Sequence, residues 1–152
     1  EQVAKLLMKF SDTPLLDVSS FYELVLFCFF TGNADMHLKN FSLLKRENMG
    51  YNLSPAYDLV PTALVNEADK EELALTLNGK KSKLNYRDFL SAYENSGLSK
   101  KILDDTLELF RYCKPEITTV LRKSFVSEQM KQKYMALLET RYKQLGLDCY
   151  AN

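Results

Sequence analysis

The feature that most constrains the fold is an apolar stretch from Phe21 to Phe30, which stops at Thr31-Gly32 and is followed at once by a polar octet. The stretch is about ten residues long and contains Glu23, whereas a membrane-spanning helix needs roughly 20 apolar residues. We therefore predict a helix that is buried in the core of a folded domain. Ser20, with Glu23 three positions later, forms a capping box that predicts the helix start, and Gly32 can take the left-handed conformation that ends a helix.

The composition is that of a single ordinary globular domain. The chain has 152 residues, of which 46% are hydrophobic and 26% are charged, and its 20 Lys and Arg residues balance its 20 Asp and Glu residues. A net charge of zero supplies no long-range field for nucleic acid or an anionic membrane, so we expect neither as a direct partner. The three cysteines are far apart and lack zinc or disulfide spacing, which favours the cytoplasm.

The remaining segments predict helices around one short hairpin. Residues 2–10 have helical apolar spacing, the hairpin has strands Phe41–Leu44 and Tyr51–Leu53 around a turn from Lys45 to Gly50, and Leu73–Leu77 alternates like a further strand. Four later helices are predicted, each with an apolar stripe: Tyr86–Glu94, Lys100–Tyr112, Pro115–Phe125 and Glu128–Leu145. The predicted fold class is therefore mainly α with a small β-hairpin.

The polar octet from Asn33 to Asn40 has the spacing of a phosphotransfer loop. It places Asp35 five residues before Asn40, with His37 between them, and Asp58 follows the hairpin. In kinases one Asp accepts the proton of the substrate hydroxyl, a later Asn ligates Mg²⁺, and a second Asp holds the metal over the phosphates. Because Mg²⁺ prefers oxygen ligands, we predict that Asp35, Asn40 and Asp58 face one cleft.

Together these motifs resemble the C-terminal region of HipA-like Ser/Thr kinases, the toxin halves of bacterial toxin–antitoxin pairs. The resemblance rests on the octet, the hairpin, Ala56–Thr62 and Leu73–Lys80, and covers nearly all of the chain. The Asp-x-His-x-x-Asn form is also similar to the loops of phosphoinositide kinases, which share this fold. The resemblance implies the C-terminal lobe of a protein-kinase-like fold over residues 1–152: helices leading to the loop in 1–32, the loop, hairpin and metal segment in 33–62, and a mainly helical subdomain in 63–152.

The resemblance also implies roles for individual residues. Asp35 would be the catalytic base, Asn40 and Asp58 would bind Mg²⁺, and His37 would stand near the transferred phosphate, where many protein kinases have a Lys. Lys39, Asn40 and Asp58 are the candidate contacts to ATP. The implied partners are a DNA-binding antitoxin and a protein substrate with a Ser or Thr acceptor, with aminoacyl-tRNA synthetases among the substrate types of relatives.

Each of these residues also has a plainer structural interpretation. Asp35 and Asp58 could be turn residues, and Asn40 could be a cap or turn former. His37 could be a packed, hydrogen-bonded side chain, and Lys39 could be solvated. Because His37 is the chain's only His, it cannot belong to a multi-His metal site.

Parts of a complete kinase are missing from the sequence. None of the five glycines falls in a glycine-rich loop, no strand Lys for the α and β phosphates is evident, and the first residue is Glu rather than Met. We therefore expect that the N-terminal lobe lies outside this chain and that the chain alone is nearly inert. The rival interpretations are a non-catalytic helical interaction module or pseudokinase lobe, and a small-molecule kinase of the same fold. Tyr57 is interpreted as a core residue, and Asn78–Lys83 as an exposed turn.

Overall fold

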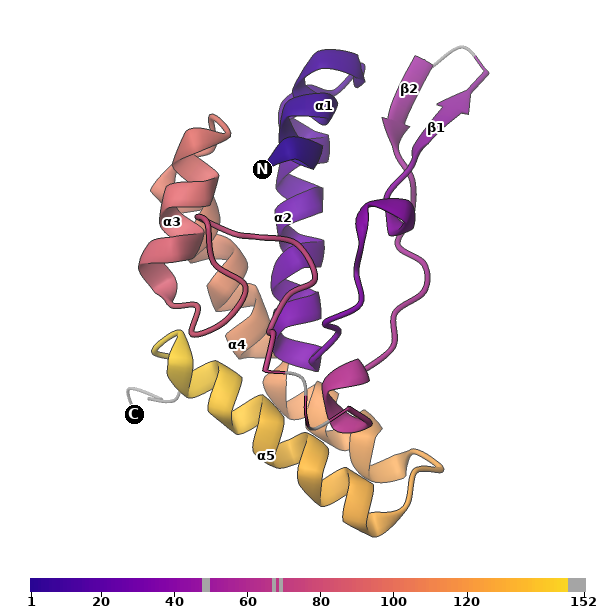
Figure 1. The fold of residues 1–152 in the computed structure, drawn as a ribbon, viewed down its shortest axis with the longest axis vertical. Helices are drawn as coiled ribbons and strands as arrows, with labels where there is room; N and C mark the ends of the chain where they lie inside the picture. The colour runs from indigo at the N-terminus through magenta and orange to yellow at the C-terminus, as the bar shows by residue number, and fades with distance from the viewer. Residues whose placement is uncertain (48–49, 67, 69, 148–152) are drawn as a thin grey trace.

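Helix α2 (Pro14–Thr31) lies in the middle of the fold, and Figure 1 shows α3 on one side of it, the hairpin on the other and α5 across its C-terminal end. The computed structural model describes residues 1–47, 50–66, 68 and 70–147. The other elements are α1 (Gln2–Phe10), η1 (Leu38–Asn40), β1 (Leu43–Arg46), β2 (Gly50–Leu53), η2 (Thr62–Leu64), α3 (Tyr86–Asn95), α4 (Lys100–Lys123) and α5 (Glu128–Gln144). The predicted class, mainly helical with one two-stranded antiparallel sheet, is confirmed.

Helix α2 begins earlier than predicted and ends where predicted. Its first residue is Pro14, whose missing N–H does no harm in the first turn, and Ser20 lies inside the helix, so the predicted capping box is wrong. Gly32 ends the helix with a φ of 73°, and its N–H donates to the Cys28 carbonyl. By length and composition α2 would pass for a membrane span, yet its side chains supply the centre of the core.

Aromatic side chains of α2 reach the helices around it. The Phe30 ring lies 4.9 Å from that of Phe110 in α4 and 4.6 Å from that of Tyr142 in α5, measured between centroids. The Phe29 ring lies 5.4 Å from that of Phe89 in α3. Such pairs add about 0.5–1.5 kcal/mol each beyond the burial of their area. Two neighbouring residues of α2 therefore tie it to three other helices.

The hairpin is confirmed, with its strands displaced by one or two residues from the prediction. Strand β1 pairs antiparallel with β2, so that Leu43 is opposite Leu53, and the predicted turn includes positions 48 and 49, which lie outside the described residues. Asp17 of α2 holds the hairpin, because its Oδ2 accepts the Leu53 N–H at 2.7 Å and the Ser11 hydroxyl at 2.6 Å. The hairpin is thus fixed to the central helix.

Helix α4 is continuous where two helices were predicted. Pro115 was expected to begin a second helix, but it lies inside α4, which runs for 24 residues. Proline has no N–H to donate to the Arg111 carbonyl four residues back, and this missing bond weakens the helix locally. Buried residues on both sides of it, such as Phe110 and Leu121, keep the apolar face packed against the core. Tertiary packing therefore outweighs the local signal. Helices α3 and α5 match their predicted bounds within one residue.

The predicted strand Leu73–Leu77 is wrong. Within the described residues this segment has no neighbouring strand, and only Leu77 forms a bridge, to Lys80 across the Asn78-Gly79 turn. Leu73 and Leu77 are nevertheless buried, at 5% and 3% exposure. Alternating leucines therefore anchor an irregular segment on the helical core, a pattern that resembles a strand in sequence.

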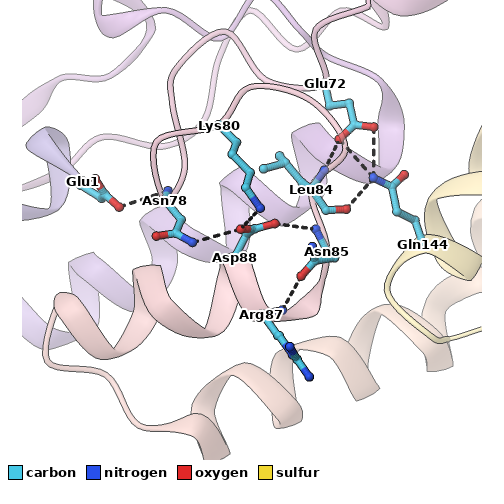
Figure 2. Close-up of polar contacts among 9 residues, drawn as sticks. All are labelled: Glu1, Glu72, Asn78, Lys80, Leu84, Asn85, Arg87, Asp88 and Gln144. Atoms are coloured by element: carbon cyan, nitrogen blue, oxygen red, sulfur yellow. Dashed lines mark hydrogen bonds and ion pairs between the residues drawn. The ribbon is translucent and has the colours of Figure 1, made fainter.

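Polar contacts, shown in Figure 2, hold the segment that leads into α3. The Asp88 carboxylate accepts the Lys80 ammonium at 2.7 Å, the Asn78 side-chain amide at 3.0 Å and the Asn85 N–H at 3.1 Å. The Asn85 side chain in turn accepts the Arg87 N–H at 2.9 Å, which completes a capping box at the start of α3. Part of the predicted exposed turn is thus tied to a buried carboxylate.

A second carboxylate connects the same segment to α5. Glu72 accepts the Leu84 N–H at 2.8 Å and the Gln144 amide at 3.0 Å and 3.1 Å (Figure 2). It also forms an ion pair with Arg141. The Gln144 amide also donates to the Leu84 carbonyl at 2.5 Å. These bonds fix the C-terminal end of α5 against the start of α3.

Substituting Gly32 tests how tightly the end of α2 is packed. Gly32 and Gly146 share a φ of +73°, but a Cβ on Gly32 would lie 2.5 Å from Leu137 Cδ2 and 3.2 Å from Ala63 Cβ, whereas one on Gly146 meets nothing within 4 Å. Gly146→Ala should lower the free energy of unfolding by about 1–2 kcal/mol, the cost of the left-handed backbone. Gly32→Ala should cost about 1 kcal/mol more, because Leu137 must move. Urea unfolding measures both, and equal losses would contradict the packing argument.

Asp88 should make stability depend on pH. Desolvation raises the pKa of Asp88, but hydrogen bonds from Lys80, Asn78 and the Asn85 N–H outweigh it, so the net pKa lies below its ordinary value. The carboxylate therefore stabilises the fold fully above its ordinary pKa of about 4, and this contribution is lost as the pH falls through the lowered folded pKa.

We therefore expect Asp88→Asn to lower the free energy of unfolding by about 1–3 kcal/mol at pH 7, because a buried network loses a charged acceptor. The difference from the wild type should shrink below about pH 4. Urea unfolding from pH 7 to pH 3 checks this, with Asp105→Asn on the exposed side of α4 as control. A difference that stays constant over this range would show that the charge of Asp88 plays no part.

Candidate functional site

The loop of residues 33–40 is fastened at its start to the segment that follows Asp58. The Gly32 carbonyl accepts the Ala63 N–H at 3.0 Å, and the Ala34 N–H donates to Thr62 Oγ1 at 2.9 Å. The loop then closes in the single turn η1, which brings Asn40 to a buried position. Because the loop starts directly at the end of α2, the packed helix fixes where it begins.

Asn40 and Asp58, two of the three residues predicted to face one cleft, lie against each other. Asn40 Nδ2 donates to Asp58 Oδ2 at 2.9 Å, although the two residues come from opposite ends of the hairpin. Asn40 is 4% exposed, whereas Asp58 is open to solvent. Among the described residues, none donates a hydrogen bond to Asn40 Oδ1 or Asp58 Oδ1. These two oxygens are the kind of ligand that Mg²⁺ prefers.

Asp58 has an unusual backbone. Its φ of 57° lies in the left-handed region, which costs a residue with a Cβ roughly 1–2 kcal/mol. Asp and Asn tolerate this region better than most residues. The Asn33 side-chain amide donates to the Asp58 carbonyl at 3.5 Å. A strained backbone held by its neighbours is frequent where a side chain must point in one direction.

Asp35 and His37 form a second pair. His37 Nε2 lies 3.1 Å from Asp35 Oδ1, and their side chains are 50% and 54% exposed, so His37 is not a packed core residue. They line a cavity of about 270 Å³, whose other walls are Ala34, Thr62, Ala63, Val65, Asn66 and Glu71. Asn40 and Asp58 do not line this cavity. The structure therefore brings the predicted residues together as two contacting pairs, Asn40 with Asp58 and Asp35 with His37.

Lys39 and Tyr57 connect the loop to the segment around Asp58. The Lys39 side chain is exposed, and its carbonyl accepts the Tyr57 hydroxyl at 3.1 Å. Tyr57 is 41% exposed, so its interpretation as a core residue is wrong. Its place directly before Asp58 was the only signal in the sequence that it belongs to the site. The hydroxyl also donates to Ser42 Oγ at 3.4 Å, which adds a contact at the base of the hairpin.

Sequence reasoning also missed Asn33 and Thr62. The Asn33 Oδ1 accepts the Asp35 N–H at 3.1 Å, an Asx turn for which the signal was an Asn two residues before an Asp. Thr62 Oγ1 accepts the Ala34 N–H from a distant segment, and nothing local in the sequence indicates this contact. Both residues shape the loop through these contacts to its backbone.

The described part of the chain holds no group of three or more His, Cys, Asp or Glu side chains suited to a metal ion. A zinc-type cage is therefore not found there. A magnesium site needs no such group, because Mg²⁺ is commonly held by one or two side chains together with phosphate oxygens and water.

A larger apolar groove of about 850 Å³ lies beside the site. It runs between α2, α4 and α5, with Phe27, Ile117 and Tyr134 among its walls, and Ala56 and Leu59 on either side of Asp58 also line it. None of the predicted site residues lines the groove. It is a separate surface from the polar cavity of Asp35 and His37.

Comparisons with known proteins agree with the resemblance noted in the sequence. A model of the HipA-like C-terminal domain matches residues 1–116. A Haemophilus influenzae protein named "Putative kinase" is 26% identical over an alignment 168 positions long, gaps included, which covers 97% of this chain and 47% of that protein. "Putative kinase Y4dM" of Sinorhizobium fredii is 33% identical over 96 residues, which cover 62% of this chain and 24% of that protein.

A solved structure shows the same fold. A chain of the Shewanella oneidensis MR-1 toxin–antitoxin complex of HipA, HipB and operator DNA matches with a TM-score of 0.78 at 21% identity, over 93% of this chain and 34% of that one. The chain thus spans about half the length of the Haemophilus influenzae relative, 47%, and a third of the structural neighbour, 34%. Because the family model matches 116 of its 152 residues, the chain belongs to the family of HipA-like C-terminal domains.

Proposed function

We propose that the intact protein is an ATP-dependent Ser/Thr kinase of the HipA-like toxin type, and that this chain is the C-terminal lobe of its kinase fold. The observation that carries the proposal is the contact of Asn40 Nδ2 with Asp58 Oδ2 across the hairpin, next to a loop that presents Asp35. Family membership and two relatives named as kinases support it. A scaffold has no physical need to place these polar side chains together.

Asn40 and Asp58 are suited to hold Mg²⁺. Each keeps one side-chain oxygen to which no described residue donates, and the Asp58 carboxylate is open to solvent, where a phosphate can approach. When bound, Mg²⁺ would neutralise negative charge on the phosphates of ATP. The hydrogen bond between Asn40 and Asp58 would hold the two side chains in fixed relative positions before the ion binds. Lys39, exposed beside Asn40, would add a positive charge near the phosphates.

Asp35 would accept the proton of the Ser or Thr hydroxyl. The hydroxyl oxygen forms a bond to the γ-phosphorus, the bond from that phosphorus to the oxygen bridging the β-phosphate breaks, and ADP leaves. The proton passes to the Asp35 carboxylate. His37 Nε2, in contact with Asp35 Oδ1, would orient this carboxylate beside the transferred phosphoryl group. The cavity of about 270 Å³ beside this pair has room for an acceptor side chain.

The remaining groups that bind the phosphates of ATP would come from other parts of the intact protein. The sequence has neither a glycine-rich loop nor a strand Lys for the α and β phosphates, and these groups supply much of the electrostatic stabilisation in kinases. The chain alone should therefore have little activity. The rival functions are a non-catalytic interaction module and a small-molecule kinase, and both predict different results in the experiment below.

The proposal includes a partner and a location. The structural neighbour was solved with HipB and operator DNA, which supports a DNA-binding antitoxin as the partner of the intact protein here. The balanced charge of this chain is consistent with DNA contact through that partner. We place the protein in the cytoplasm, where ATP, the antitoxin and a protein substrate such as an aminoacyl-tRNA synthetase would meet it.

Substituting the two acids tests the function. In the intact protein, Asp35→Ala should lower the rate of ATP turnover about 10²–10⁴-fold, because the proton acceptor is lost. Asp58→Ala should lower it at least as much and should also weaken Mg²⁺-dependent nucleotide binding. Asp105→Ala, an exposed acid on α4, is the matched control and should leave the rate unchanged. Turnover is measured as ADP release, and nucleotide binding by calorimetry.

The identity of the molecule that receives the phosphate distinguishes the proposed function from its rivals. Wild-type turnover no higher than that of Asp35→Ala and Asp58→Ala would favour the interaction module. Phosphate found on small hydroxyl compounds but not on Ser or Thr of cell proteins, as read by mass spectrometry, would favour the small-molecule kinase. Phosphoserine or phosphothreonine that disappears in both variants is the result that we expect.

A further inference from the structure

Asn33 is a buried polar residue to which the proposed chemistry gives no role. It is 1% exposed, the first residue after Gly32, and its own N–H donates to the Cys28 carbonyl at 2.9 Å. Buried polar side chains cost free energy unless both their donors and their acceptors are used. The contacts of this amide therefore show why it is there.

The two ends of the Asn33 amide bind different parts of the site. Its Oδ1 accepts the Asp35 N–H at 3.1 Å, and its Nδ2 donates to the Asp58 carbonyl at 3.5 Å. One side chain thus touches the backbone of the proposed proton acceptor and the backbone of the proposed metal ligand. Asp35 and Asp58 are 23 residues apart in the sequence, and among the described contacts this is the one side chain bonded to both.

The chemistry of both contacts requires an amide of this length. An Asp would keep the acceptor for the Asp35 N–H and lose the donor to the Asp58 carbonyl, and an apolar residue would lose both. The Asp58 carbonyl is attached to a backbone with a φ of 57°, so a donor at this carbonyl helps to hold the strained conformation that aims the carboxylate.

We propose that Asn33 is a positioning residue that sets the distance and orientation between Asp35 and Asp58, and so aligns the hydroxyl acceptor with the metal-bound phosphate. This inference rests on the proposed function. Alignment of this kind matters because a displacement of about 1 Å can cost a reaction about 10²-fold in rate.

Asn33→Asp in the intact protein tests the inference, with Asn78→Asp as a matched control. Asn78 Nδ2 donates to Asp88 Oδ1 at 3.0 Å (Figure 2), and neither residue lines the cavity of Asp35 and His37. Both substitutions thus turn an amide donor into a carboxylate that faces an oxygen. In Asn33→Asp the Mg²⁺ concentration for half-maximal turnover should rise about 10–100-fold, as for other residues that orient metal ligands. In Asn78→Asp stability should fall, while the Mg²⁺ requirement of the folded protein stays unchanged.

A second variant separates positioning from general damage. Asn33→Ala removes both the acceptor for the Asp35 N–H and the donor to the Asp58 carbonyl, so the folded variant should also show a raised Mg²⁺ requirement. It serves as the test if Asn33→Asp does not fold.

Two results would overturn the inference: a wild-type Mg²⁺ requirement in folded Asn33→Asp or Asn33→Ala, or a loss of activity that only follows the loss of stability. Failure of the proposed function looks different. If Asp35→Ala and Asp58→Ala retain activity, the kinase assignment itself fails. If those variants are inactive while Asn33→Asp behaves as wild type, only the role of Asn33 is refuted.

Discussion

The left-handed closure of α2 at Gly32 is the constraint from which the candidate site follows. The helix is held by aromatic contacts to three other helices, so the position of its last residue is fixed by the core. A φ of +73° at Gly32 then turns the chain, and no Cβ can be accommodated there without moving Leu137. Because the next residues are Asn33, Ala34 and Asp35, the core determines where the proposed chemistry begins.

Much of the fold could be predicted from periodicity and local signals, and the errors have identifiable physical causes. Leu73–Leu77 looked like a strand because its leucines alternate, but a strand needs a neighbour and the described segment has none. Pro115 looked like a helix start because proline prefers that position, yet the apolar face of α4 continues across it. Ser20 looked like a cap, while α2 already starts at Pro14. In each case tertiary contacts outweighed a correct local preference.

In the candidate site, too, the residue spacing predicted some contacts, and others became visible only in the fold. The contact of Asn40 with Asp58 followed from a hairpin that brings its two ends together. The roles of Thr62 and Tyr57 did not, because their bonds to Ala34 and Lys39 join segments that no local pattern connects. The contact between the two ends of the hairpin was thus predicted, and the residues that hold the loop in place were missed.

Pro115 lies in α4 where this helix forms a wall of the apolar groove, between the lining residues Cys113 and Glu116. Because proline has no N–H, the Arg111 carbonyl has no donor four residues on, and α4 has one hydrogen bond fewer at this turn. Beyond the proline, Ile117, Val120 and Leu121 line the groove together with Phe27 of α2. A bend of α4 at this turn would therefore change the width of the groove while the end of α2 stays in place.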